Sequence, residues 1–478
     1  MTSSRWSFPS SLVRAPMPKP ALAACLAVAT LVAGCGGGGG GSGSSPTAAT
    51  PAPTVDQLAN VCTPAGEKAW VQAYLNDVYL FYRDIVQVDP NAYATPEAYF
   101  NALIVTSKDR FSFVEPQSAA DAFFSAGQDI GYGAVFKYDT ANRLRIGFVD
   151  AGGPLALAGV GRGAVITAIG GTATAALTTT QLNAALLPSA VGVPVALTLV
   201  DPGQSAPRTV TVTSAAVVEN PVPLAQVLPV DPANPASAKV GYLLFNDQIA
   251  TSESKLADAI TTFQQAGVSD VVVDLRYNGG GYLYIASELA YMLGGNNIPS
   301  GATFERLVYN DKHPEKTSSP SNTVPFYPIG QAGLSLPTLN LKRVFVITAP
   351  GTCSASESVI NGLAPFVQVI RIGGTTCGKP YGFIQANNCG KAYFAIQFQG
   401  VNSAGFGDYT AGFAPTCAVA DDFDHALGNT TEGRLSATLA YARSGSCPAT
   451  SITAERLQSA EAVERLVGRP ERQQRLLR

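Results

Sequence analysis

The sequence predicts an α/β core that is preceded by a small helical domain and a β-rich module. Residues 216–447 alternate apolar, β-branched strands with amphipathic helices. Residues 59–125 repeat apolar side chains at helical spacing. Residues 126–215 carry short strands bounded by glycine-rich turns. At 478 residues the chain is long enough for two or three such domains.

Residues 1–34 predict an export signal. Its start is basic, with Arg5, Arg14 and Lys19. The apolar stretch 21–34 is too short to span a bilayer stably. It ends Leu-Val-Ala-Gly-Cys, so we expect Cys35 to be lipidated as the new N-terminus; the alternative is an ordinary cleaved signal with a chance cysteine. Gly36 is not acidic, which favours a periplasmic location on the outer membrane.

Residues 35–58 are rich in Gly, Ser and Pro, which predicts a disordered tether. The net charge is only −3, and 14% of the residues are charged. No basic stripe with interleaved aromatic residues is present, so the sequence gives no indication of nucleic-acid binding.

Six cysteines remain after the signal and the lipidated residue: Cys62, Cys353, Cys377, Cys389, Cys417 and Cys447. An even number in an exported chain indicates disulfides, and fifteen pairings are possible. A metal site is disfavoured, because there is no CxxC pair and the chain has two histidines. Bound metals and cofactors are therefore not expected.

The elements follow in order along the chain. In the helical domain, Thr95 is a plausible N-cap with Pro96 in the first turn. The β-rich module has candidate strands at 130–136 and 143–149, and a closing pair at 194–200 and 208–214. In the core, the predicted strands are 238–247, 269–278, 341–350 and 367–374, and the predicted helices are 253–267, 285–295 and 354–364. The Arg-rich segment 448–478 is expected to be a surface helix or a frayed tail.

Three short segments of the core suggest acyl transfer. Ser354 lies in GTCSASE, and Lys379 follows 25 residues later in CGKPYGF. A serine hydroxyl needs a neighbouring base, and a lysine can be that base if burial lowers its pKa. Upstream, an apolar strand breaks into Gly279, Gly280 and Gly281, and such a break exposes backbone N–H groups that can hold an oxyanion.

The ordered set Asp274–Gly280, Ser354–Glu357 and Gly378–Lys379 resembles the C-terminal processing, or tail-specific, proteases. These are Ser-Lys peptidases with an embedded PDZ domain, and the resemblance covers about residues 62–445. It implies an α/β protease core with crotonase-like ββα units and an inserted β-rich PDZ domain at 126–215. It also implies a protein or peptide substrate that is engaged near its C-terminus.

The resemblance assigns Ser354 as the nucleophile, with Ser356 as the alternative. Lys379 becomes the general base and then the general acid, and Lys391 is the rival lysine in the wrong register. The oxyanion donors would be the N–H of Ala355 and one glycine N–H of 279–281, foremost Gly280. The two histidines, His313 and His425, stand in polar segments that do not suggest a triad.

Supporting roles fall on a second set of residues. We expect Asp274 and Arg276 to organise the glycine turn, and Glu357 and Thr376 match supporting positions of the family. Some members carry an Asp 11 residues after the nucleophile or a Gln four after the lysine; this chain has Pro365 and Phe383 there. Gln385 is the remaining candidate for a third polar member.

Two further expectations concern a peptide site and a disulfide clamp. The carboxylate-binding loop of a PDZ domain would map to Gly131, Tyr132, Gly133 and Ala134; the alternative is a module that only scaffolds or gates the core. Cys353 and Cys377 flank the proposed catalytic pair, so a disulfide between them would clamp nucleophile and base together. Separate bridges or free thiols remain open at this point.

The resulting expectation is a lipid-anchored, periplasmic serine endopeptidase without metal or cofactor. The main alternative is a catalytically inactive PDZ/protease-like peptide-binding lipoprotein, which Pro365, Phe383 and the possible Cys353–Cys377 clamp favour. A crotonase-like acyl-CoA enzyme is a third reading, against which export, the predicted disulfides and the β-rich module argue.

Overall fold

The computed structural model describes residues 53–449 and 475–476. The predicted signal, Cys35 and most of the predicted tether lie outside the described residues. Helix α1 (Val55–Leu58) forms inside the expected tether, because the Thr54 hydroxyl accepts from the Gln57 N–H while the Gln57 side chain accepts from the Thr54 N–H. Among the described residues, no helix combines the length and apolar character needed to cross a membrane.

The core is built on a six-stranded sheet with the order β10-β11-β12-β16-β17-β22. Its strands are β10 (Leu224–Pro229), β11 (Lys239–Leu244), β12 (Asp270–Asp274), β16 (Arg343–Thr348), β17 (Gln368–Gly373) and β22 (Cys417–Ala418). The strands β11 to β22 are parallel, and β10 pairs antiparallel with β11. The apolar segments predicted as buried core strands are thus neighbours in one parallel sheet.

Helices cover both faces of this sheet. One face packs on α7 (Ser252–Ala266), α8 (Leu283–Gly294) and α10 (Ala355–Leu363), through residues such as Val271 and Val273. The other face packs on α11 (Gly433–Ser444) through residues such as Val272 and Phe345. This burial on two sides explains the continuous β-branched runs. Active-site candidates then fall at the carboxyl ends of the strands, where β12, β16 and β17 run into loops.

A second sheet has the order β13-β23-β18-β21-β14-β15. Its members are β13 (Gly281–Tyr282), β14 (Thr303–Tyr309), β15 (Thr323–Pro325), β18 (Tyr381–Phe383), β21 (Ile396–Val401) and β23 (Arg475–Leu476), and α9 (Pro314–Ser318) follows β14. The two residues of β23 pair parallel with both β13 and β18. For residues 448–478 the sequence predicts a surface helix or a frayed tail; residues 475–476 form a strand instead, and most of the segment lies outside the described residues.

The N-terminal region contains α2 (Pro64–Val78), α3 (Pro96–Leu103) and α4 (Gln117–Ala126). As predicted, the Thr95 hydroxyl caps α3 by accepting from the Ala98 N–H at 3.1 Å. This region is tied to the core, because β1 (Phe113–Pro116) pairs with β20 (Lys391–Phe394), which also pairs with β19 (Ala386–Asn388). The Cys62–Cys389 disulfide adds a covalent tie.

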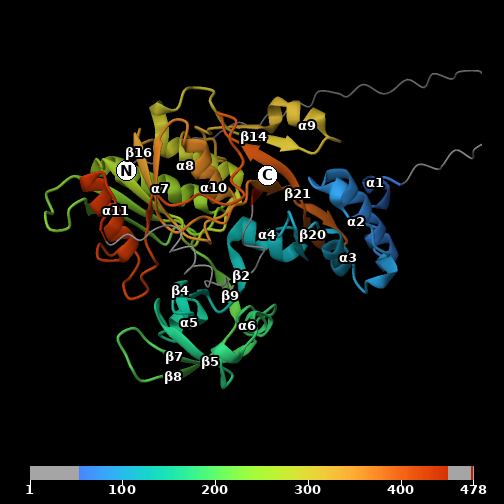
Figure 1. Cartoon of the computed structure of the whole chain (residues 1–478), viewed down its shortest axis with the longest axis horizontal. Coiled ribbons are helices and arrows are strands. Elements are labelled where there is room, and N and C mark those ends of the chain that lie inside the picture. Colours follow the sequence, from blue (N-terminus) through green and yellow to red (C-terminus); the bar gives the residue numbers. More distant parts are fainter. Residues whose placement is uncertain (1–52, 450–474, 477–478) are drawn as a thin grey trace, which may run out of the picture. The chain divides into compact units, whose positions relative to one another are not determined.

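The β-rich module is one sheet with the path β3-β4-β5-β7-β8, drawn in teal to green in Figure 1. Its elements are β3 (Ala134–Tyr138), β4 (Leu144–Val149), α5 (Pro154–Leu157), β5 (Val165–Ile169), β6 (Thr172–Ala173), α6 (Thr179–Leu186), β7 (Pro194–Val200) and β8 (Arg208–Thr213). The predicted closing pair, β7 and β8, is confirmed. Strand β9 (Ala215–Val218) pairs with β2 (Gln128–Gly131), so it crosses the boundary expected between 215 and 216.

Candidate active site

Ser354 lies at the junction between β16 and α10, where the chain turns from strand to helix. Its φ is 61°, a left-handed value that residues with a side chain rarely adopt. The residue is fully buried, and its Oγ has no hydrogen-bond partner in the described part of the chain. A buried, unpaired hydroxyl costs about 1–3 kcal/mol. Strain and an unpaired hydroxyl at one serine are the features expected of a nucleophile.

Ser356, the rival serine, is occupied differently. Its Oγ donates to Asn278 Oδ1 at 2.8 Å and accepts from Gln248 Nε2 at 3.2 Å. Asn278 precedes the three glycines, and its side-chain N–H donates to the Phe245 carbonyl at 3.0 Å. Ser356 therefore fastens the glycine turn to α10, and the geometry favours Ser354 as the reactive hydroxyl.

The Lys379 side chain is fully buried beside two aromatic rings. Its Nζ lies 3.9 Å from the centroid of the Phe383 ring and 5.0 Å from that of Phe111. Gly378, just before it, has φ 82°, and a Cβ there would meet the Thr410 carbonyl oxygen at 2.2 Å. Only glycine therefore fits at this turn, which delivers the lysine into the core.

Lys391, the rival lysine, forms ion pairs with two glutamates of the N-terminal region. Its Nζ forms ion pairs with Glu67 Oε2 at 2.5 Å and with Glu97 Oε1 at 3.4 Å. Partial burial lowers the pKa of Lys391, but the two glutamates outweigh it and raise that pKa above its ordinary value. An amine held in its protonated form cannot serve as a base, so the geometry favours Lys379.

One carboxylate joins the serine turn to the lysine turn. Glu357 accepts hydrogen bonds from the backbone N–H groups of Ser354 at 3.0 Å, Gly378 at 2.8 Å and Lys379 at 2.8 Å. It also accepts from the Thr376 hydroxyl at 2.6 Å, and Thr376 in turn accepts from a neighbouring backbone N–H. Complete burial raises the pKa of Glu357, and these hydrogen bonds oppose the rise. This geometry is compatible with the supporting roles expected of Glu357 and Thr376, which stay predictions.

A disulfide makes the same connection covalently. Cys353 and Cys377, which flank the proposed catalytic pair, are bonded as the predicted clamp. Cys417–Cys447 is the third bridge, so all six remaining cysteines are paired. The sulfur atoms of the clamp and the Glu357 carboxylate lie close enough to hold a metal ion. Bonded sulfurs are not thiolates, however, and this carboxylate is already filled with hydrogen bonds.

The glycine turn lies against the serine turn. The Cys353 N–H donates to the Asn278 carbonyl at 3.2 Å. Gly281 has φ 131°, and a Cβ there would meet the Gln248 carbonyl oxygen at 2.2 Å. The N–H of Gly280, our first choice as an oxyanion donor, donates to Asn278 Oδ1 at 2.9 Å in this structure. Ala355 is the first residue of α10, so its N–H has no carbonyl partner within the helix.

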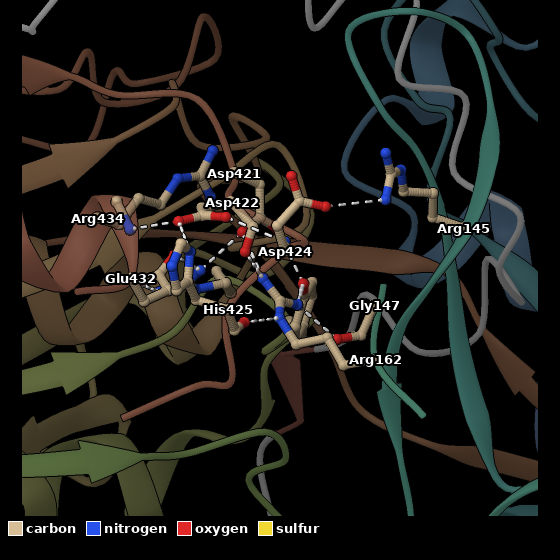
Figure 2. Close-up of polar contacts among 12 residues, drawn as sticks. Arg145, Gly147, Arg162, Asp421, Asp422, Asp424, His425, Glu432 and Arg434 are labelled. Atoms are coloured by element: carbon tan, nitrogen blue, oxygen red, sulfur yellow. Dashed lines mark hydrogen bonds and ion pairs between the residues drawn. The ribbon is translucent and has the colours of Figure 1, made fainter. Parts of the chain in front are cut away.

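A buried charge network supports the strand that carries the glycine turn. Arg276 is fully buried and bonds Asp274 at 2.8 Å, Asp421 at 2.7 Å and Glu432 at 2.7 Å. Asp421 Oδ1 also forms an ion pair at 2.8 Å with Nη2 of Arg162, which belongs to the β-rich module, as Figure 2 shows. The expected organising role of Asp274 and Arg276 fits this geometry.

Sequence reasoning missed Asp421, Glu432 and Arg162. Burial raises the pKa of Asp421, but Arg162 and Arg276 outweigh it and hold that pKa well below its ordinary value. Tyr277 joins the network by donating to Asp421 Oδ2 at 2.8 Å. The segment around 421–425 is polar, and no local pattern shows that an aspartate there neutralises two distant arginines.

The remaining polar candidates have other partners. Gln385, proposed as a third polar member, donates to Asp121 Oδ1 at 3.0 Å and to Asn387 Oδ1 at 2.9 Å. Phe383, which stands four residues after the lysine where some family members have a glutamine, is the side chain that lies beside Lys379. His313 contacts Asp77 and Glu315, and His425 contacts Asp422.

The predicted peptide-binding residues span the end of β2 and the start of β3. Tyr132 belongs to the core of the module, and its hydroxyl donates to the Val193 carbonyl at 3.3 Å. Gly133 has φ 70°, and its carbonyl accepts from the Asp150 N–H at 2.9 Å. Gly131 ends β2 and Ala134 begins β3. Peptide binding at this loop stays a prediction.

Two family models match the chain over the regions that build this site. The Peptidase S41 N-terminal domain matches residues 66–113, and Peptidase family S41 matches residues 239–387, which hold the glycine turn, Ser354 and Lys379. The chain therefore carries segments that match the N-terminal and the catalytic domain of S41 peptidases. These matches imply peptidase activity on a protein or peptide substrate.

One solved structure is similar over most of its length. The chain is similar to an S41 protease from Bacteroides fragilis, with 27% identity, a TM-score of 0.62, and coverage of 79% of this chain and 97% of that chain. It is also similar to a photosystem II D1 C-terminal processing protease, with 19% identity, a TM-score of 0.47, and coverage of 74% and 92%. No curated protein sequence matches the chain.

Proposed function

We propose that the chain is a serine endopeptidase in which Ser354 is the nucleophile and Lys379 is the general base. The observation that carries this proposal is the unpaired, buried Ser354 Oγ on a turn that Glu357 and a disulfide both fasten to the Lys379 turn. Nucleophile and base are thereby held on a rigid frame before substrate arrives, which is how orientation contributes to rate.

The reaction would proceed in two steps. The Ser354 Oγ attacks the scissile carbonyl while its proton passes to Lys379 Nζ, which then gives that proton to the leaving amine as the C–N bond breaks. Water then attacks the acyl ester while its proton passes to Lys379 Nζ, and the lysine returns that proton to Ser354 Oγ as the ester C–O bond breaks and the acid product leaves. The N–H of Ala355 would stabilise the oxyanion, and the Gly280 N–H would join it once it is released from Asn278.

For substrate and location, we propose exported proteins that are engaged near their C-terminus by a membrane-anchored enzyme. The basic start, the short apolar stretch and Cys35 support a lipoprotein in the periplasm. The extended pairing of β23 with β13 and β18 supports a site that accepts an extended segment as a strand. The fold of the β-rich module is compatible with the proposed PDZ domain.

The test is a proteolysis assay. The enzyme is a protein of residues 53–478, and the substrate is an unfolded protein with an apolar C-terminus. We expect the wild-type enzyme to cleave this substrate and a chelator to leave the rate unchanged. Ser354→Ala and Lys379→Ala should each lower the rate of cleavage by about 10³-fold or more. Cleavage that survives Ser354→Ala contradicts the proposal.

The second candidate is an inactive peptide-binding lipoprotein. The engaged Gly280 N–H favours it, because an oxyanion donor is taken up by Asn278. Wild type that binds the substrate tail as tightly as Ser354→Ala but never cleaves it would establish this alternative.

A further inference from the structure

The two rings beside Lys379 come from different parts of the fold. Phe383 ends β18 and is fully buried, and Phe111 lies in the segment that leads into β1. The Lys379 Nζ lies 3.9 Å from the Phe383 ring centroid and 5.0 Å from that of Phe111. Both distances are within the range of about 6 Å at which a ring face attracts a cation.

Each ring is held from outside the site. Asp109 accepts from the Phe111 N–H at 2.8 Å and from the Tyr79 hydroxyl at 2.8 Å, so a buried carboxylate fixes the Phe111 turn. Phe383 packs edge-on against Phe113 and Phe394, with centroids 6.0 and 6.1 Å away. The backbone of Phe111 and the ring of Phe383 are thus each held by contacts that do not involve Lys379.

We propose that Phe383 and Phe111 are positioning residues that hold Lys379 and stabilise its ammonium form during the reaction. The inference rests on the proposed function. When Ser354 attacks, the lysine gains a proton in a site where burial disfavours charge. The negative faces of the rings offset part of that cost until the proton moves to the leaving amine. The N-terminal region would thus contribute directly to the catalytic lysine through Phe111.

The test replaces a ring by an apolar side chain without a π face. In Phe383→Leu the ammonium loses its ring, so the pKa of Lys379 falls. We expect the acid limb of kcat/KM against pH to move down by about 0.5–1.5 pH units. The plateau falls as well, because the protonated intermediate is less stabilised. Phe111→Leu moves the limb in the same direction by less, since its ring is more distant, and serves alone if Phe383→Leu does not fold.

Phe394→Leu is the matched control. Phe394 is equally buried and packs on Phe383, but its substitution leaves both rings beside Lys379 in the chain. We expect it to lower the unfolding free energy without moving the acid limb. An acid limb that stays in place or moves upward in both ring variants overturns the inference, as does an equal shift in Phe394→Leu. If these occur while Ser354→Ala and Lys379→Ala are inactive, the proposed function stands and only the role of the rings fails.

Discussion

Glu357 determines the geometry of the proposed catalytic pair at the scale of single residues. Its two oxygens accept from three backbone N–H groups and a hydroxyl on both turns. A glutamine has one acceptor oxygen and an N–H₂ group, so at least one backbone N–H would face another donor.

Glu357→Gln should therefore damage both stability and catalysis. We expect the free energy of unfolding to fall by about 2–4 kcal/mol, because buried donors are left unpaired. We expect kcat to fall by about 10²-fold as the two turns separate. Urea unfolding and peptide hydrolysis measure the two effects, and the exposed Glu315→Gln should change neither. A Glu357→Gln variant with wild-type kcat would refute this role.

Sequence reasoning reached the individual residues unevenly. Ser354 and Lys379 could be chosen because register with a family motif distinguishes them from Ser356 and Lys391. The physical reason appears only in three dimensions, where Ser356 fastens Asn278 and Lys391 pairs with Glu67. Asp421 could not be found, because its partners Arg162 and Arg276 are more than a hundred residues away.

At the scale of elements, the strand-to-helix junction after β16 and the loop after β17 act as one unit. Both the Cys353–Cys377 disulfide and Glu357 cross between them. The strands and helices themselves were predictable, since β-branched runs buried on two faces and helices with capping residues carry local signals. Strand β23 was not, because a two-residue strand depends on its partners and not on its own sequence.

Removing the Cys353–Cys377 disulfide should lower kcat as well as stability, whereas removing the Cys417–Cys447 disulfide should lower stability alone. Cys353 and Cys377 are 24 residues apart, and Cys417 and Cys447, which give the matched control, are 30 apart. Loops of such similar length predict a similar loss of about 3–4 kcal/mol when each pair is changed to alanine. We expect kcat to fall about 10- to 100-fold only in Cys353→Ala/Cys377→Ala. Equal kcat losses in the two double variants would contradict a positioning role.

Helix α8 carries a buried acid that should make stability depend on pH. Burial, together with the neighbouring Glu253 carboxylate of α7, raises the pKa of Glu288 to about 9. Since the unfolded carboxyl has an ordinary pKa, its stabilising contribution is complete below about pH 4.5 and is lost as the pH rises through about 9.

The side chain introduced by Glu288→Gln cannot ionise. The free energy of unfolding of this variant should therefore increase relative to that of wild type as the pH rises from 5 to 9. The expected gain is up to about 1 kcal/mol per pH unit, measured by urea unfolding at pH 5, 7 and 9. Glu253→Gln should lower the pKa of Glu288 toward its ordinary value, because it removes the charge that opposes ionisation of Glu288. The pH range over which stability is lost should therefore become narrower. A difference between wild type and Glu288→Gln that does not vary with pH would show that Glu288 is ionised in the folded protein.

At the scale of the whole molecule, segments far apart in sequence converge on one site. The N-terminal region supplies Phe111 beside Lys379. The β-rich module supplies Arg162 to the charge network around Asp421 (Figure 2). Domain boundaries drawn from composition could not show these contacts. They mark where patterns change, whereas β9 and β1 pair across them.

The C-terminal residues should compete with substrate. Strand β23 lies between β13, which begins at Gly281, and β18, which follows Lys379. If substrate takes the same place, a chain ending at Ala449 should show kcat/KM raised several-fold, mainly through a lower KM. A synthetic peptide of residues 467–478 should inhibit that shortened chain. Unchanged KM together with no inhibition by the peptide would separate β23 from the substrate path.

The most direct test of the central claim is covalent trapping with a peptidyl phosphonate, which bonds to an activated serine. The adduct is then located by tandem mass spectrometry. We predict a single adduct on Ser354 in wild type and a labelling rate reduced by about 10²-fold or more in Lys379→Met, in which the side chain stays long and apolar but cannot take a proton. An adduct on Ser356, or a labelling rate that Lys379→Met leaves unchanged, would contradict a Ser354–Lys379 peptidase.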